Sequence, residues 1–113
     1  MHKVLLIDDK RPFHWLWTWG IRDHFEFLHA YSIQQGLELF QAHDGISAIV
    51  VDACVDHWWL DTCELIGQLS EDFNGPLIAA PCQWWHFEPM KRAGCTEHVW
   101  KWQVSKRLCE LFP

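Results

Sequence analysis

Several features that define other classes of protein are absent from this 113-residue sequence. There is no run of 18 or more apolar residues, so we expect no membrane-spanning helix. The five cysteines are an odd number and form no CxxC pair, which indicates reduced thiols rather than a disulfide framework. The chain opens on an aliphatic run followed by acids, so we expect no signal peptide and a cytoplasmic location.

Basic residues are also scarce. Nine Lys and Arg against fifteen Asp and Glu give a formal charge of −6, and the basic residues are dispersed along the chain. Nucleic-acid binding needs a basic patch that can neutralise phosphates. The sequence therefore argues against nucleic acid as a direct partner.

Short apolar runs alternate with longer segments of helical period along the whole chain. The expected strands are 3–7, 25–30, 48–51, 77–80 and 98–100, and the expected helices are 12–23, 33–42, 61–69, 87–93 and 104–112. Strands that alternate with helices indicate a parallel sheet covered on both faces, and right-handed crossovers make it a doubly wound α/β sandwich. With no linker or internal repeat, we predict one domain over residues 1–113.

Acidic residues follow two of the most apolar expected strands. Asp8 and Asp9 come directly after 4–7, and Asp52 comes directly after 48–51. Ligands of parallel sheets bind beyond the carboxyl ends of the strands, so these carboxylates converge if the first and third strands are neighbours. Three close carboxylates repel one another unless a cation or a proton intervenes, and Mg²⁺ prefers oxygen ligands. The sequence therefore predicts a magnesium site; the alternative is that these acids are solvated loop residues.

Together these motifs resemble the receiver domains of bacterial response regulators, the CheY-like family. Residues 4–9 are similar to the opening of such a domain, and 49–52 are similar to the strand with its phosphoacceptor aspartate. Gly94, followed seven residues later by Lys101, is similar to the last signature of the family. The resemblance covers the whole chain in order. It implies a flavodoxin-like (βα)5 fold with a five-stranded parallel sheet in the order 2-1-3-4-5.

The resemblance also implies a function in two-component signal transduction and phosphorelay. Asp52 would accept a phosphoryl group from a histidine kinase or a phosphotransfer protein. Asp8, Asp9 and Asp52 would hold Mg²⁺ together with the backbone carbonyl of Cys54. Lys101 would pair with the phosphoryl group or with Asp52, unless it is simply a solvated lysine at the end of a strand. Such a protein is a signalling module and not an enzyme, and it acts through protein contacts or as part of a longer regulator.

The sequence departs from the family at the positions that read the phosphoryl group. Pro81 stands where the family has a Ser or Thr, and His98 stands at the aromatic position coupled to that hydroxyl. Trp102 replaces the proline after the lysine, and Thr62 replaces a glycine. We therefore expect an atypical receiver with impaired phosphorylation of Asp52. The alternative is a pseudo-receiver that works without phosphorylation, as a protein-interaction or dimerisation module.

Nine tryptophans are several times the usual proportion, and most of them follow expected strands at the edge that has the acids. Two adjacent pairs lie in expected loops, where two neighbouring side chains rarely both face inward, so we expect a hydrophobic interface, and a homodimer is one expected use of it. The candidate interface residues are Trp58, Trp59, Trp84, Trp85 and Trp102. Core packing is the alternative, and we expect it for Trp15, Trp19 and Trp100.

Cysteine and histidine residues offer a third reading, a ligand binder that reuses the fold. The residues concerned are Cys54, His57, Cys82, His86 and His98. They could converge on a soft metal or a haem, but no zinc motif of recognised spacing occurs. We therefore favour this alternative least.

Overall fold

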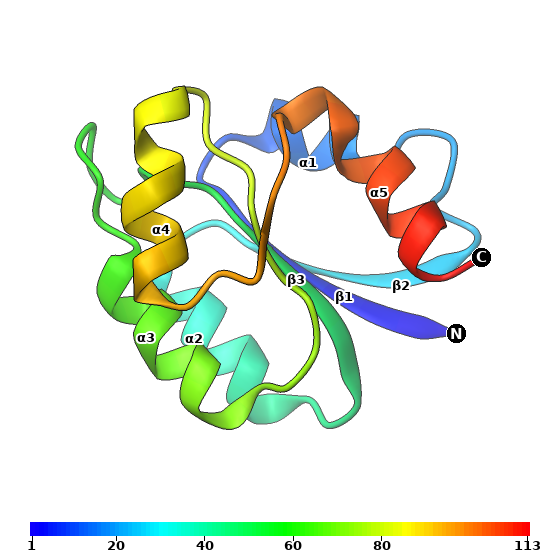
Figure 1. Cartoon of the computed structure of the whole chain (residues 1–113). Helices are drawn as coiled ribbons and strands as arrows, with labels where there is room; N and C mark the ends of the chain where they lie inside the picture. The colour runs from blue at the N-terminus through cyan, green and yellow to red at the C-terminus, as the bar shows by residue number, and fades with distance from the viewer.

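The computed structural model describes all 113 residues, which form one five-stranded parallel sheet with helices on both faces (Figure 1). The strands are β1 (His2–Ile7), β2 (Phe25–Ala30), β3 (Ile46–Val51), β4 (Leu77–Ala79) and β5 (Glu97–His98). Their order in the sheet is β2-β1-β3-β4-β5, and every neighbouring pair is parallel. The predicted doubly wound fold and its strand order are confirmed.

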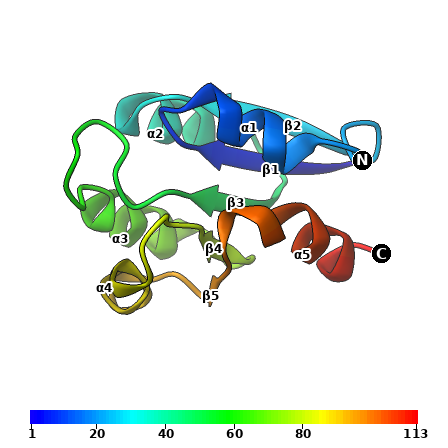
Figure 2. The same cartoon turned by 90° about the horizontal axis from the view of Figure 1, so that it is seen from above.

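Two helices cover one face of the sheet and three cover the other (Figures 1 and 2). The first set is α1 (Arg11–Thr18) and α5 (Val104–Leu111), and the second is α2 (Ile33–Ala42), α3 (Cys63–Asp72) and α4 (Phe87–Ala93). Short 3₁₀ helices, Trp84–His86 and Lys101–Gln103, precede α4 and α5. No helix in the structure has both the length and the apolar character needed to cross a membrane.

The central strands are apolar along their whole length because both faces of the sheet are covered. Along β1, Val4 and Leu6 pack in the cluster that includes α1 and α5. Leu5 and Ile7 pack in the cluster on the opposite face, and all four side chains are fully buried. Alternate residues of a strand point to opposite faces, so a strand buried on both sides reads as a continuous aliphatic run. The apolar runs therefore end where each strand leaves the core, and polar residues begin at that edge.

Local signals at Ser32 and Gly94 fix two of the helix ends. The Ser32 hydroxyl accepts the backbone N–H of Gln35 at 3.0 Å and caps α2. Gly94 ends α4 with φ = +142°, and its N–H donates to the carbonyls of Met90 and Lys91. A left-handed φ favours glycine because it has no Cβ.

Helix α1 and strand β5 are shorter than the sequence predicts. Helix α1 ends at Thr18 rather than near residue 23, because the chain turns at Gly20, whose φ is +78°. Strand β5 covers Glu97–His98 rather than 98–100. The Trp100 N–H bonds the Gln103 side chain and the Trp100 carbonyl accepts the Gln103 N–H, so the chain turns there into a 3₁₀ helix.

Two glycines make a matched test of this fold. In Gly94→Ala the new Cβ would lie 2.7 Å from the Ser70 Cβ and the backbone would be strained, so we expect a loss of about 1–3 kcal/mol in the free energy of unfolding. Gly67 lies inside α3 with nothing closer than 3.8 Å to an added Cβ, so Gly67→Ala should stabilise the protein by about 0.5–1 kcal/mol. Urea unfolding of both variants measures the two effects, and a neutral Gly94→Ala would contradict the structure.

Candidate functional site

Three carboxylates meet where β1 and β3 end. Asp8 and Asp9 directly follow β1, Asp52 directly follows β3, and the two strands are hydrogen-bonded neighbours. One oxygen from each carboxylate lies within 4.8 Å of the others. Asp8 and Asp52 are buried, whereas Asp9 is exposed. The structure thus brings the three predicted acids together, rather than leaving them as separate solvated loop residues.

The ammonium group of Lys101 lies between two of these acids. Its Nζ donates to Asp8 Oδ2 at 2.8 Å and to Asp52 Oδ1 at 3.0 Å. The same Nζ lies 4.2 Å from the ring centre of Phe13 and 5.0 Å from that of Trp17. Lys101 is only 4% exposed, so it is not a solvated lysine. The faces of aromatic rings attract a cation that has been removed from water. The two rings therefore stabilise the buried ammonium on the sides where no carboxylate contacts it.

The oxygens that Lys101 leaves free decide what else the site can bind. Asp8 Oδ1 accepts the Lys10 backbone N–H at 2.9 Å, and Asp9 Oδ1 pairs with Lys10 Nζ at 3.2 Å. Asp52 Oδ2 accepts no hydrogen bond from the chain. A cluster of carboxylate oxygens with two oxygens unpaired, Oδ2 of Asp9 and Oδ2 of Asp52, suits a hard divalent cation, so the residues present fit Mg²⁺.

Burial shifts the protonation of Asp8. Loss of solvation, reinforced by the negative charge of Asp52, raises the pKa of Asp8 to about 6, although Lys101 opposes the shift. Near neutral pH, above this pKa, Asp8 is mostly ionised, and the three acids are paired with only two ammonium groups, those of Lys101 and Lys10. This excess charge is what a bound cation would relieve.

A pocket of about 240 Å³ opens beside Asp52. It is lined by Lys10, Asp52, Ala53, Cys54, His57, Trp58, Cys82, Gln83 and His86. Four of the cysteines and histidines considered for a soft metal or haem line this pocket, but no three of them bring ligand atoms together as the acids do. The fifth, His98, lies on β5 with its ring 4.5 Å from the ring of Phe87. The structure therefore gives no soft-metal centre.

The positions expected to read a phosphoryl group lack the usual groups. Pro81 is buried after β4 and offers no hydroxyl. His98 is exposed. The polar side chains that the loop after β4 brings to the pocket are those of Cys82, Gln83 and His86.

Two residues that the sequence analysis did not assign to the site hold the loop after β3. The buried Thr62 hydroxyl donates to the Asp52 carbonyl at 2.9 Å, with the Ala53 carbonyl at 3.1 Å. The Asp61 carboxylate accepts the backbone N–H groups of Val55, Asp56 and His57, each at 2.9 Å. An Asp and a Thr just before a helix are a recognisable capping signal, but only the folded loop shows that they fix the backbone at Asp52.

A third residue, His14, had no signal in the sequence. It is buried on α1, its Nε2 lies 2.7 Å from the Asp8 carbonyl, and its Nδ1 lies 2.8 Å from Nδ1 of His29. Because a carbonyl only accepts, Nε2 holds the proton of His14, and Nδ1 accepts from His29. Burial lowers the pKa of His14 to about 4, so the imidazole is neutral at physiological pH.

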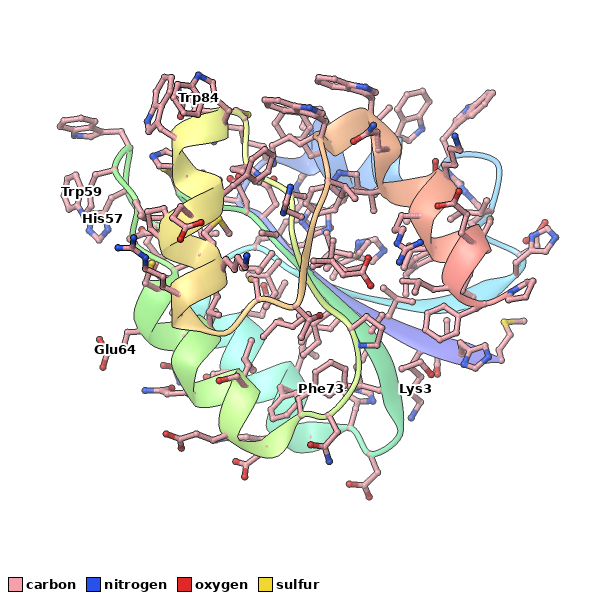
Figure 3. All side chains as sticks on the ribbon, viewed as in Figure 1. Lys3, His57, Trp59, Glu64, Phe73 and Trp84 are labelled. Carbon is pink, nitrogen blue, oxygen red and sulfur yellow. The ribbon has the colours of Figure 1, made fainter.

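Most tryptophans lie exposed at the edge that contains the acids. Figure 3 shows Trp59 and Trp84 projecting outward beside α3 and α4, near His57. Trp58 is 87% exposed and Trp84 is 67% exposed. We call Trp58, Trp59, Trp84, Trp85 and Trp102, all of which are exposed, the tryptophan surface.

The expectation that Trp15 and Trp19 pack in the core is wrong. They are 58% and 63% exposed, whereas Trp17 is fully buried. Positions 15 and 19 lie four residues apart on one face of α1, and position 17 points about 200° away from 15, toward the sheet. Trp100 is half-buried, and its ring stacks on that of Trp102 at 5.3 Å.

Solved structures with a similar architecture include response regulators. One from Burkholderia pseudomallei, crystallised with a phosphorylated aspartic acid, a calcium ion and citrate, has a TM-score of 0.81 at 17% identity over 100% of this chain and 67% of that chain. The chain has the receiver-domain fold. TrrA of Thermotoga maritima, in complex with Mg²⁺ and BeF, gives 0.80 at 15% identity and 99% and 100% coverage, and CheY4 of Vibrio cholerae gives 0.80 at 16% and 99% of each chain. No family model and no curated protein sequence matches this receiver-fold chain.

The raised pKa of Asp8 makes a prediction about stability and pH. Because about 6 lies above the ordinary value of 3.8, the folded protein binds this proton more tightly than the unfolded chain does. The stabilisation is therefore fully present below pH 3.8 and is lost as the pH rises through about 6. Asp8→Asn, which removes the ionising group, should raise the free energy of unfolding by about 1–2 kcal/mol at pH 8 without divalent ions.

Urea unfolding between pH 4 and pH 8 measures this difference between Asp8→Asn and the wild type. The gain should shrink toward zero at pH 4, where Asp8 of the wild type is already protonated. Asp23→Asn, at an exposed residue in the turn before β2, is the control and should show no such pH dependence. A gain from Asp8→Asn that is the same at both ends of the range would contradict the assigned pKa.

Proposed function

We propose that this chain is an atypical response-regulator receiver domain that accepts a phosphoryl group on Asp52 in two-component signal transduction. One observation supports the proposal above all others. Lys101 bridges Asp8 and Asp52 inside the protein and leaves Asp52 Oδ2 without a partner beside an open pocket. A buried acid with one paired and one free oxygen is arranged for nucleophilic attack on a group that enters the pocket.

In this proposal Oδ2 of Asp52 attacks the phosphorus of a phosphohistidine on a histidine kinase or phosphotransfer protein. The new Asp52 O–P bond forms as the P–N bond breaks, and the imidazole of the donor keeps the electron pair and takes a proton. Lys101 stays hydrogen-bonded to Oδ1 of Asp52 and offsets the charge of the entering phosphoryl oxygens. Phosphoryl transfer depends mostly on positioning and on such neutralisation, so the fold needs few reactive groups.

The acidic cluster would hold the divalent cation of this reaction. Asp8, Asp9 and Asp52 provide the carboxylate oxygens, and the resemblance adds the backbone carbonyl of Cys54. When bound, a cation such as Mg²⁺ neutralises the developing charge on the phosphoryl oxygens. The Burkholderia and Thermotoga proteins, with calcium and with Mg²⁺–BeF, are the basis for extending this chemistry to the present chain.

This chain departs from the receiver family in the side chain that would respond to the phosphoryl group. Without a hydroxyl at Pro81, no side chain at that position can hydrogen-bond the phosphoryl group and move with it. Cys82, Gln83 and His86 are the polar side chains after β4 that line the pocket beside Asp52. We therefore propose a signalling protein, not a turnover enzyme, in which phosphorylation of Asp52 is slow and is read through different contacts.

Phosphorylation can be measured directly. We expect incubation with phosphoramidate and Mg²⁺ to add about 80 Da, one phosphoryl group, in the intact mass of the protein. Asp52→Asn should abolish the adduct. Asp56→Asn, at an exposed acid four residues further along the same loop, should retain it. No adduct and no Mg²⁺ affinity in the wild type would refute the proposal and favour a phosphorylation-independent pseudo-receiver.

The exposed tryptophans favour a second candidate function, a protein-interaction or dimerisation module. Trp58 and Trp59 contact each other edge to face at 5.6 Å, and Trp84 and Trp85 do so at 5.9 Å. Exposed aromatic groups of this size are rare away from interfaces and dominate binding where they occur. The observation that supports this candidate is that all five members of the tryptophan surface are exposed.

We expect the wild-type chain to dimerise through the tryptophan surface in sedimentation experiments at about 100 µM. The double variant Trp58→Ala/Trp84→Ala should weaken the association at least tenfold, since truncating a central interface aromatic costs about 2 kcal/mol or more. Trp19→Ala removes a tryptophan just after α1 that is 63% exposed and lies outside the surface, so it should leave association unchanged. A monomeric wild type would exclude the dimer.

A further inference from the structure

A second pocket, of about 420 Å³, lies between α1 and β2, away from Asp52. Its α1 wall includes Arg11 and Trp15, and Arg22 follows in the turn. Its other wall includes Phe27 and His29 of β2 and Tyr31 just after it. A spacing of four places Arg11 and Trp15 on one side of α1, and a spacing of two places Phe27, His29 and Tyr31 on one face of the strand. The two walls therefore face each other.

The position of β2 in the sheet explains why this pocket is open. β2 is an edge strand, and only α1 and α5 cover that face of the five-stranded sheet. Figure 2 shows α1 beside β2, and the other helix near this edge, α2, packs on the opposite face of the sheet. The outer part of the β2 face is therefore left uncovered, and its side chains line a recess instead of a core.

The charge of the pocket is opposite to that of the chain. No acidic residue lines it, and neither Arg11 nor Arg22 takes part in any ion pair, in a protein with a formal charge of −6. The Arg11 guanidinium lies 4.4 Å above the ring centre of Tyr31. Stacking of this kind fixes the plane of the guanidinium and leaves its N–H edge free for an anion.

The remaining lining offers a ring-binding wall and an unpaired polar atom. Trp15 is 58% exposed, and Phe27 and Tyr31 are half-buried. His29 donates its Nδ1 proton to His14, so its Nε2 is an acceptor, and it makes no hydrogen bond within the chain. A flat ring can lie against the aromatic groups while a hydroxyl donates to His29.

We propose that the pocket between α1 and β2 binds a small organic anion that has a flat aromatic ring, of the size of a nucleoside monophosphate. The ring packs against Trp15 and Phe27, and the phosphate or carboxylate pairs with Arg11 or Arg22. The volume lies within the usual range for small-molecule sites, about 300–1,000 Å³. The site needs no phosphorylation of Asp52, so it stands independently of the proposed function.

Titration of the ¹⁵N-labelled chain with AMP, followed by NMR, tests the proposal, with adenosine and inorganic phosphate as the two halves of the ligand. We expect AMP to bind saturably and at least tenfold more tightly than either half, with the largest shifts at the pocket residues. A second probe, 2-naphthoate, tests a carboxylate in place of the phosphate. No saturable binding of either AMP or 2-naphthoate below about 10 mM would overturn the proposal. Phosphate that binds as tightly as AMP would also overturn it, because the ring would then contribute nothing.

Variants locate the binding. For whichever probe binds, Arg11→Gln or Arg22→Gln should raise the Kd by about tenfold or more, as expected for a lost charged hydrogen bond. Trp15→Ala should also raise the Kd. Lys91→Gln, at an exposed cation of α4 without an ion pair, is the matched control and should have no effect. Asp52→Asn should also bind normally, which separates this site from the phosphorylation chemistry. Equal weakening by Lys91→Gln would show diffuse attraction and refute a built site.

Discussion

The structure depends on one buried ammonium group. The fold places the ends of β1 and β3 side by side, so Asp8 and Asp52 are forced together in a region with little water. Lys101 pairs with both, and the rings of Phe13 and Trp17 lie against the same Nζ. Leaving one partner of such a buried pair alone typically costs about 3–5 kcal/mol, so the two strands and the turn after β5 constrain one another.

Helix α1 connects that centre with the rest of the molecule. Phe13 and Trp17 contact the Lys101 ammonium, and His14 holds the backbone carbonyl of Asp8. The neighbouring positions on the outer side of the same helix include Arg11 and Trp15, which line the pocket against β2. One short helix therefore packs against the acidic site and also forms one wall of the second pocket. The His14–His29 hydrogen bond joins the two regions physically.

The acidic site and the tryptophan surface share one edge of the sheet. Trp58 lines the pocket beside Asp52, and the loop that includes Trp84 and Trp85 begins just after Gln83, which lines it too. Any partner that approaches Asp52 must therefore contact large exposed aromatic groups. Position 81 is a proline and offers no hydroxyl, so the proposed function assigns the reading of the site to contacts of this kind.

The order of strands and helices, the N-cap of α2 at Ser32 and the acids at the ends of β1 and β3 follow from the sequence, because short-range periodicity and capping determine them. The helical spacing also shows that Trp15 and Trp19 lie on one side and Trp17 on the other. It does not show which of the two sides of α1 packs against the sheet. The burial of Lys101, the hydrogen bonds of Thr62 and His14, and the open face of β2 arise from contacts between segments far apart in the chain. The tertiary structure alone decided these, because packing across the sheet, and not local preference, determines which side chains lose water and which remain exposed.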